Sequence, residues 1–127
     1  MSEMAKKEIV LERDIEAKLV REVKRRGGLT YKFSSPGCTG VPDRIIIVPD
    51  KYYPRVVFVE LKTKNGTLKR NQVNQIHLMR DKGAEVHVTY GVDQMMALIT
   101  ELFPGPAPGR KPRVPKELPE LDTQPVG

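Results

Sequence analysis

Hydrophobic residues near the N-terminus recur with the spacing of an amphipathic helix. Four of them lie four residues apart on one helix face, with Val20 beside them: Leu11, Ile15, Leu19 and Val23. The RRGG segment that follows has basic residues, which favour the last turn of a helix, and glycines, which favour its end. The pattern predicts a first helix over residues 9–26.

The next apolar segments have the alternation and the short runs of β-branched residues that are typical of strands. LTYKF (29–33) alternates, and DRIIIV (43–48) is a β-branched run that we expect to be buried on both faces as a central strand. RVVFVELK (55–62) follows after a short turn. The short link predicts that the second and third strands form a hairpin.

Helical spacing returns in the second half of the chain. It predicts a helix over residues 69–82 that ends at Gly83, a strand over 84–90 and a closing helix over 92–103. The residues expected to face inward from the first of these helices are Val73, Ile76 and either Leu78 or Met79. The order α-β-β-β-α-β-α predicts an α/β fold with a small mixed sheet flanked by helices.

The composition changes at Pro104. Seven of the 11 prolines lie between this residue and the C-terminus, where hydrophobic periodicity is nearly absent. Such a segment buries too little apolar surface to offset the entropy of ordering it. We therefore expect one folded domain over residues 1–103 and an extended or disordered tail over 104–127.

The remaining composition excludes several classes of protein. One cysteine cannot form an internal disulfide, and two histidines without ligand spacing make a zinc site a poor fit. The chain has no apolar run of membrane-spanning length, and its N-terminus is charged, so we expect a cytoplasmic protein without a membrane partner. The net charge of +6 favours a polyanionic partner such as nucleic acid.

Charged residues stand at three positions in or beside the apolar strands, where a charge is costly. Alternation places Glu60 and Lys62 side by side on one face of the third strand, where a simple surface ion pair is the plain alternative. Asp43 opens the preceding strand, and antiparallel pairing brings the start of that strand beside the end of the next. Two carboxylates and an ammonium group are therefore expected to converge at one end of the sheet.

Two close carboxylates repel each other unless a cation lies between them. Their hard oxygen atoms suit Mg²⁺ or Mn²⁺, and the backbone carbonyl of Leu61 is a natural further ligand. Lys62 is placed to orient a bound water and to neutralise charge that develops on a phosphate. This combination favours hydrolysis of a phosphodiester.

The motifs GVPDRIII, VVFVELK and GTLKRNQ, in this order and spacing, resemble the VRR-NUC branch of the PD-(D/E)xK nucleases. The resemblance covers the chain from Glu12 to Tyr90 and implies a restriction-endonuclease-like αβββαβ core. It implies that Asp43 and Glu60 bind the metal and that Lys62 is the catalytic lysine.

The resemblance also implies two site residues that lie far from these motifs in the sequence. The glutamine that opens the second core helix of the family matches Gln72. The family places an acidic residue of the first helix in the metal site, directly or through a water molecule. We assign this role to Glu16, which lies beside the buried stripe, and Glu12, one turn earlier on the same edge, is the alternative.

Polar and basic residues near the motifs are candidate DNA contacts, and solvated loops are the plain alternative for them. They lie before the Pro42-Asp43 pair or after the ELK segment (60–62): Lys32, Ser34, Ser35, Lys64, Lys69 and Arg70. The residues together favour a metal-dependent DNA endonuclease. The resemblance implies selectivity for branched or four-way-junction DNA, a phage or prophage origin and a homodimer.

The sequence alone leaves two other functions open. One is a non-catalytic nucleic-acid-binding or adaptor module on the same scaffold, whose tail would recruit a partner such as a helicase. The other is a restriction-type nuclease, for which the chain has little spare sequence to read bases.

Overall fold

The computed structural model describes residues 10–105 of the 127-residue chain. Its elements, in chain order, are α2 (Glu12–Arg25), β1 (Leu29–Lys32), β2 (Arg44–Val48), β3 (Arg55–Lys62), α3 (Arg70–Asp81), β4 (Glu85–Tyr90) and α4 (Gly91–Leu102). The predicted α/β class and element order are confirmed, and the bounds agree to within about three residues. The predicted proline-rich tail lies outside the described residues from position 106 onward.

The four strands form one mixed sheet in the order β1-β2-β3-β4. β1 pairs antiparallel with β2, and β2 pairs antiparallel with β3, as the predicted hairpin requires. β4 runs parallel to β3, and α3 supplies the crossover between them. The pairing of Arg44 with Val59 sets the register that brings Asp43 beside Glu60.

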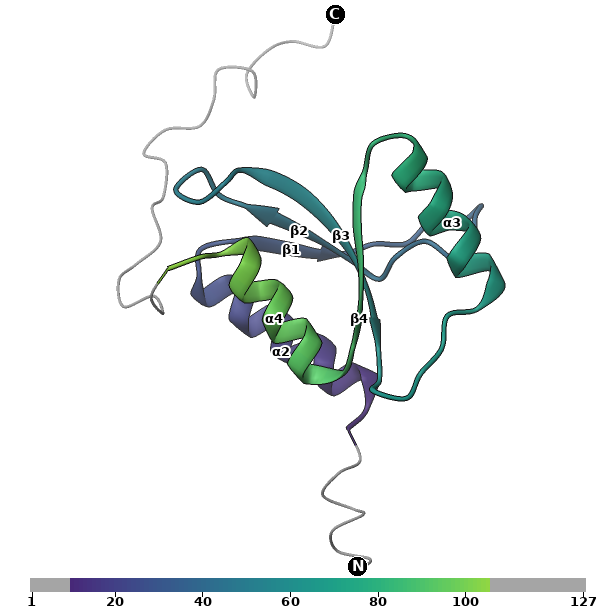
Figure 1. Ribbon diagram of the computed structural model, residues 1–127, viewed down its shortest axis with the longest axis horizontal. Coiled ribbons are helices and arrows are strands. Elements are labelled where there is room, and N and C mark those ends of the chain that lie inside the picture. Colours follow the sequence, from purple (N-terminus) through teal and green to yellow (C-terminus); the bar gives the residue numbers. More distant parts are fainter. Residues whose placement is uncertain (1–9, 106–127) are drawn as a thin grey trace, which may run out of the picture.

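The hydrophobic core lies between one face of the sheet and the two helices α2 and α4. Figure 1 shows these helices side by side, with α3 on the other side of β4. The core side chains of β3 alternate, as a strand with one apolar face requires. The core residues are Ile15, Leu19, Val23, Ile46, Val48, Val57, Val59, Leu61, Met95, Leu98, Ile99, Leu102 and Phe103.

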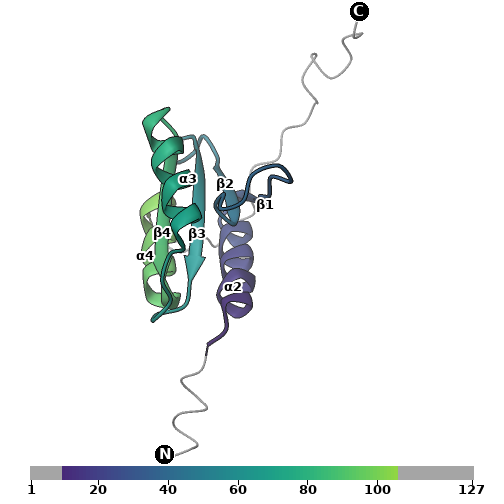
Figure 2. The ribbon, with the colours of Figure 1, turned by 90° about the vertical axis from the view of Figure 1, so that its right-hand side faces the viewer.

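The opposite face of the sheet is covered only in part. In Figure 2, α3 runs along β4, and β1 and β2 lie to its side. The expectation that β2 is buried on both faces is therefore wrong, because Ile45 and Ile47 are only half-buried. In α3, Leu78 is exposed, and Met79 is the half-buried residue of that pair.

The first helix begins later than the pattern predicted. Leu11 precedes α2 and is 43% exposed, although it continues the apolar stripe. The backbone N–H of Leu11 donates to the Asp14 side chain over 3.1 Å, which satisfies a donor at the helix start. Glu12 is consequently the first residue of α2. Within residues 10–105, no helix combines the length and apolar character that a membrane span needs.

Candidate active site

The end of strand β3 carries two charged residues into the protein interior. Glu60 is 1% exposed and Lys62 is 9% exposed, on the face opposite to Val59 and Leu61. The Lys62 Nζ lies 3.5 Å from Glu60 Oε2. The strand pairs with β4 on its other side, so the two side chains project from a fixed backbone.

Asp43 is held against β3 by backbone hydrogen bonds. Its Oδ2 accepts a hydrogen bond from the Leu61 N–H over 2.9 Å, and its own carbonyl accepts one from Phe33 N–H over 2.8 Å. The N–H and C=O of one residue in an extended strand face the same edge. The Leu61 carbonyl therefore faces the same edge of β3 as Asp43, beyond the point where β2 begins.

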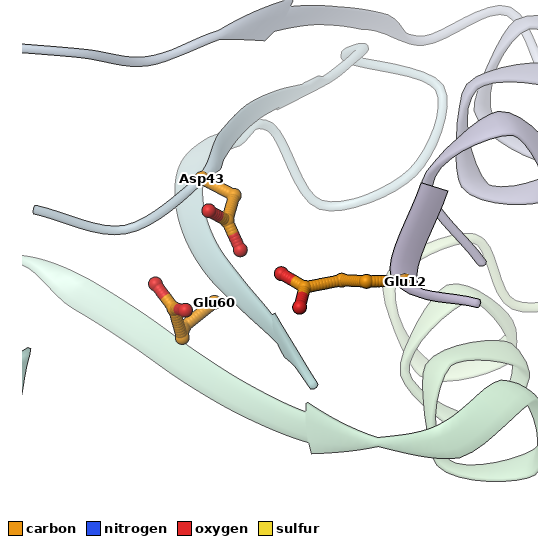
Figure 3. Close-up of side chains that lie close together, drawn as sticks. All are labelled: Glu12, Asp43 and Glu60. Atoms are coloured by element: carbon orange, nitrogen blue, oxygen red, sulfur yellow. The ribbon is translucent and has the colours of Figure 1, made fainter. Parts of the chain in front are cut away.

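Three carboxylates, those of Glu12, Asp43 and Glu60, converge at this end of the sheet and form an acidic group. One oxygen each from Glu12, Asp43 and Glu60 lies within 4.8 Å of the others. Figure 3 shows Glu12 reaching from the start of α2 toward Asp43, which directly precedes β2, and Glu60 on β3. Three elements far apart in the sequence thus present negative charge to one small volume.

The structure does not bring Glu16 into this group. Its Oε2 lies 3.1 Å from Nη1 of Arg44, which also donates from Nε to Thr30 Oγ1 over 3.3 Å. The Arg44 side chain is 11% exposed and that of Glu16 is 27% exposed. Between the two acids weighed from the sequence, the one that lies with Asp43 and Glu60 is Glu12.

Gln72 lies in the first turn of α3 and joins that helix to the acidic group. Its Nε2 donates to Glu60 Oε2 over 2.9 Å, and its Oε1 accepts from the Lys69 N–H over 2.8 Å. Both ends of the amide are therefore occupied. The side chain fixes one oxygen of Glu60 and stabilises the start of the helix.

The electrostatics of Glu60 indicate a missing positive partner. Burial, reinforced by the charge of Asp43, raises the pKa of Glu60 to about 7, and Lys62 opposes this effect. Glu60 Oε1 is buried and has no hydrogen-bond partner among the described residues. A buried carboxylate oxygen without a donor is costly.

A divalent cation fits this set of residues. Its ligands would be hard carboxylate oxygens, which Mg²⁺ and Mn²⁺ prefer, and their mutual spacing suits oxygens bound at about 2.0–2.6 Å from a shared ion. The cation would also relieve the repulsion among the carboxylates and supply the partner that Glu60 Oε1 lacks. The residues that would hold it are Glu12, Asp43, Glu60 and the carbonyl of Leu61.

The candidate DNA contacts lie on two segments that flank the acidic group. The loop before β2 holds two serines, and Lys32 ends β1. The basic residues of the second segment follow β3 or begin α3 and are exposed. The residues on the two segments are Lys32, Ser34, Ser35, Lys64, Lys69 and Arg70.

Two positioning residues were not predicted from the sequence. Arg44 is buried in the face of β2 that alternation assigns to the core, and a charge at such a position requires a partner. Gly40 has φ +94, and a Cβ there would lie 2.5 Å from the carbonyl oxygen of Asn71. The loop before Asp43 therefore packs directly on the start of α3. The alternation of β2 already places Arg44 on the core face and so could have indicated its need for a partner. The sequence around Gly40 gives no sign of its contact with Asn71.

The fold and the site define a class of protein. A mixed sheet that gathers Pro-Asp from one strand and Glu-x-Lys from the next is the restriction-endonuclease-like core of the PD-(D/E)xK nucleases. The VRR-NUC domain model matches residues 10–93, which is more than half of the chain, and the chain belongs to this family.

Individual relatives agree with this membership. A solved structure described as a VRR_NUC domain has a TM-score of 0.63 and 29% identity, over 69% of this chain and 92% of the other. A second, a VRR_NUC domain protein, has a TM-score of 0.59 and 18% identity, over 74% of this chain and 88% of the other, and supports the fold alone.

A curated phage protein also matches part of the chain. It is named "Putative nuclease p44", from Acyrthosiphon pisum secondary endosymbiont phage 1, and is 46% identical over 54 residues. The match covers 42% of this chain and 55% of the phage protein. The chain therefore spans about half the length of that relative.

Proposed function

We propose that this chain is a divalent-metal-dependent DNA endonuclease that hydrolyses phosphodiester bonds. The observation that carries the proposal is the convergence of Glu12, Asp43 and Glu60 beside Lys62, with one buried oxygen of Glu60 left without a donor. Membership of the VRR-NUC domain family supports it. A binding module would gain nothing from burying this combination of charges.

The residues of the site divide the work of hydrolysis. The ammonium group of Lys62 orients the attacking water and neutralises charge that develops on the phosphate. The attacking water releases one proton to solvent as its oxygen bonds to phosphorus, the bond to the leaving sugar oxygen breaks, and that oxygen takes up one proton. Gln72 holds one oxygen of Glu60 in place through its amide.

Mg²⁺ or Mn²⁺, held by the three carboxylates and the Leu61 carbonyl, would supply Lewis-acid polarisation of the phosphate and acidify a bound water. The hydrogen bond from the Leu61 N–H fixes the orientation of Asp43 toward that position. Glu12 is in the first turn of α2, where the helix dipole favours negative charge. These residues replace the earlier assignment of Glu16 in our proposed ligand set.

The substrate of the proposed enzyme is branched DNA, such as a four-way junction. The exposed basic residues Lys64, Lys69 and Arg70 extend a positive track from the exit of β3. A homodimer would present two such sites to two strands, as a junction requires. The folded unit of the proposal is residues 1–103, and the 104–127 segment contacts a replication or recombination partner such as a helicase. In a cell, the enzyme would act in the cytoplasm.

Cleavage of one set of synthetic DNAs tests these statements. The full chain is incubated with supercoiled plasmid, linear duplex and a four-way junction in Mg²⁺, Mn²⁺ or EDTA, and its mass in solution is measured on the same sample. Asp43→Asn should abolish cleavage that the matched variant Asp50→Asn retains, since Asp50 is exposed in the turn after β2. Equal cleavage by the wild type and Asp43→Asn would refute the proposal.

The competing function is a non-catalytic nucleic-acid-binding or adaptor module. Its distinguishing result is salt-dependent binding of the junction without cleavage in any divalent metal. The buried Glu60–Lys62 pair argues against it, because a decayed site would tolerate apolar residues at both positions.

A further inference from the structure

A cavity of about 710 Å³ opens at the end of the sheet where β3 and β4 finish. The turn after β3 and the start of α4 form two of its walls, and residues from the start of α2 form the third. None of the carboxylates of the acidic group is among the residues that line it. The catalytic residues therefore do not account for this cavity.

The cavity borders the acidic group along three segments of the chain. Lys64 follows Lys62 by two residues, and Val10 precedes Glu12 by two. Tyr90 pairs with Lys62 in the parallel register of β3 and β4, so their side chains lie on the same face of the sheet. A polymer with one phosphate at Lys62 would therefore carry its neighbouring unit to this cavity.

Close packing and one hydrogen bond hold two walls of the cavity together. Gly91 has φ +82, and a Cβ built there would lie 3.4 Å from the Cβ of Lys64, so the turn after β3 packs closely on the start of α4. The N–H of Tyr90 donates to Gln94 Oε1 over 2.9 Å and fixes the first turn of that helix. The cavity therefore has a defined shape.

Beside apolar residues and Asp93, the lining includes groups that can recognise a single nucleotide. Tyr90 provides an aromatic ring on which a base can stack, and Lys64 provides a cation for the backbone phosphate. Asn65 provides an exposed amide that can pair with a base edge. The volume lies in the range of small-molecule pockets, about 300–1,000 Å³. A base that remains paired and stacked within a duplex cannot enter a pocket of this kind.

We propose that this cavity receives one unpaired deoxynucleotide of the substrate strand, next to the phosphate that lies at Glu60 and Lys62. The inference rests on the proposed nuclease function and names the feature of branched DNA that the site selects. Insertion of the base would place a strand with unpaired nucleotides correctly for cleavage, and a fully paired strand would lack this contact.

Photo-cross-linking tests the position of the base. The full-length Asp43→Asn variant, which we expect to hold DNA without cutting it, is bound to branched DNA that carries one 5-iodouracil at each position in turn. Irradiation should link the base to Tyr90 from one or two unpaired positions and from no duplex position, as peptide mass spectrometry would show. Cross-links that avoid Tyr90, or that form equally from duplex positions, would overturn the proposal.

Kinetics supply a second measurement. Tyr90→Leu should lower the ratio of kcat/KM for branched over duplex DNA at least 10-fold, mainly through KM, and Tyr90→Phe should keep the ratio because it keeps the ring. Tyr53→Leu is the matched control, since Tyr53 is 69% exposed in the turn between β2 and β3. An unchanged ratio in Tyr90→Leu would refute the role of the ring, and if this variant does not fold, the cross-link decides.

The two proposals fail in different ways. A cross-link at Tyr90, together with a wild-type protein that never cleaves DNA, would support the nucleotide site and refute the nuclease function. Cleavage that depends on Asp43, with no cross-link at Tyr90, would support the nuclease function and refute the nucleotide site.

Discussion

Arg44 and Glu16 form an ion pair, 3.1 Å from Nη1 to Oε2, between strand β2 and helix α2. Arg44 directly follows Asp43, and Glu16 lies one turn after Glu12, so the pair joins the two elements that deliver these acids. Thr30 accepts a second hydrogen bond from the guanidinium group. The contact therefore fixes how far the start of α2 reaches toward the end of β3.

Glu16→Gln should destabilise the folded protein and should have only a small effect on the rate of cleavage. The change leaves the guanidinium of Arg44 nearly buried without its counter-charge, which should lower the free energy of unfolding by about 1–3 kcal/mol. Denaturant unfolding measures this loss. Glu22 pairs with Arg25 and Arg26 at the end of the same helix, so Glu22→Gln, which leaves Arg44 paired, should leave the affinity for Mg²⁺ unchanged. A Glu16→Gln variant with wild-type stability would contradict the structural role of the pair.

Glu12→Gln should show the opposite combination. Glu12 is exposed, so its replacement should change the free energy of unfolding by no more than about 0.5 kcal/mol. The loss of one carboxylate should lower the rate of cleavage by about 100-fold and weaken the binding of the metal. Cleavage rates and titration calorimetry with Mn²⁺ check both effects. If Glu16→Gln lowers metal affinity far more than Glu12→Gln does, the ligand is Glu16.

The stability of the metal-free protein should fall as the pH rises. The pKa of Glu60 is raised to about 7 in the folded chain, and its ordinary value is 4.5, so between these values the folded state holds a proton that the unfolded state has lost. The stabilising contribution is complete below pH 4.5 and is lost as the pH rises through about 7. Urea unfolding in EDTA across this window measures the slope.

Glu60→Gln is the control for this pH dependence, because an amide does not titrate and keeps nearly the same volume. Its stability should vary less between pH 4.5 and 8 than that of the wild type. Saturating Mg²⁺ should raise the stability of the wild type most at the upper end of this range, since the metal binds the ionised carboxylate. Identical slopes in the wild type and Glu60→Gln would show that this carboxyl is not the source.

Gln72→Met should slow cleavage and weaken the start of α3 together. The substitution removes the donor to Glu60 Oε2 and the acceptor of the Lys69 N–H but nearly keeps the volume. We expect a loss of about 1 kcal/mol in the free energy of unfolding and a rate about 10-fold lower. Gln75→Met on the same helix is the matched control for both measurements. Equal rates in the two variants would exclude Gln72 from the site.

The order of elements was predictable because each one carries its own local signal. The alternation of β3 and the β-branched run of β2 define a hairpin, and the hairpin alone places Asp43 beside Glu60. The assignment of the acid from the first helix was not predictable in this way. Glu12 and Glu16 lie on one helix edge, and periodicity cannot separate them.

Tertiary contacts distinguish these two acids. The choice depends on the residue at which α2 begins and on the buried guanidinium of Arg44, which pairs with Glu16. The partial exposure of β2 has a similar origin, since nothing in the sequence of β2 indicates that α3 packs on β4 and leaves this face of β2 uncovered. Local patterns therefore predict the strands and their motifs, and packing between elements decides which side chains meet.

Gly40→Ala should damage the site from a distance. A methyl group at this position would meet the Asn71 carbonyl at 2.5 Å and require φ +94, so the loop or the start of α3 must shift. We expect a loss of about 1–3 kcal/mol in the free energy of unfolding. Because the shift separates Gln72 from Glu60, we also expect a lower rate of cleavage in the molecules that remain folded.

Gly37 provides the matched control, since a Cβ built there meets nothing within 4 Å in the same loop. Gly37→Ala should therefore unfold and cleave like the wild type. Thermal unfolding and cleavage assays on both variants separate a general effect of loop stiffening from the specific contact with α3. If the two substitutions cost the same, the close approach of Gly40 does not position the site.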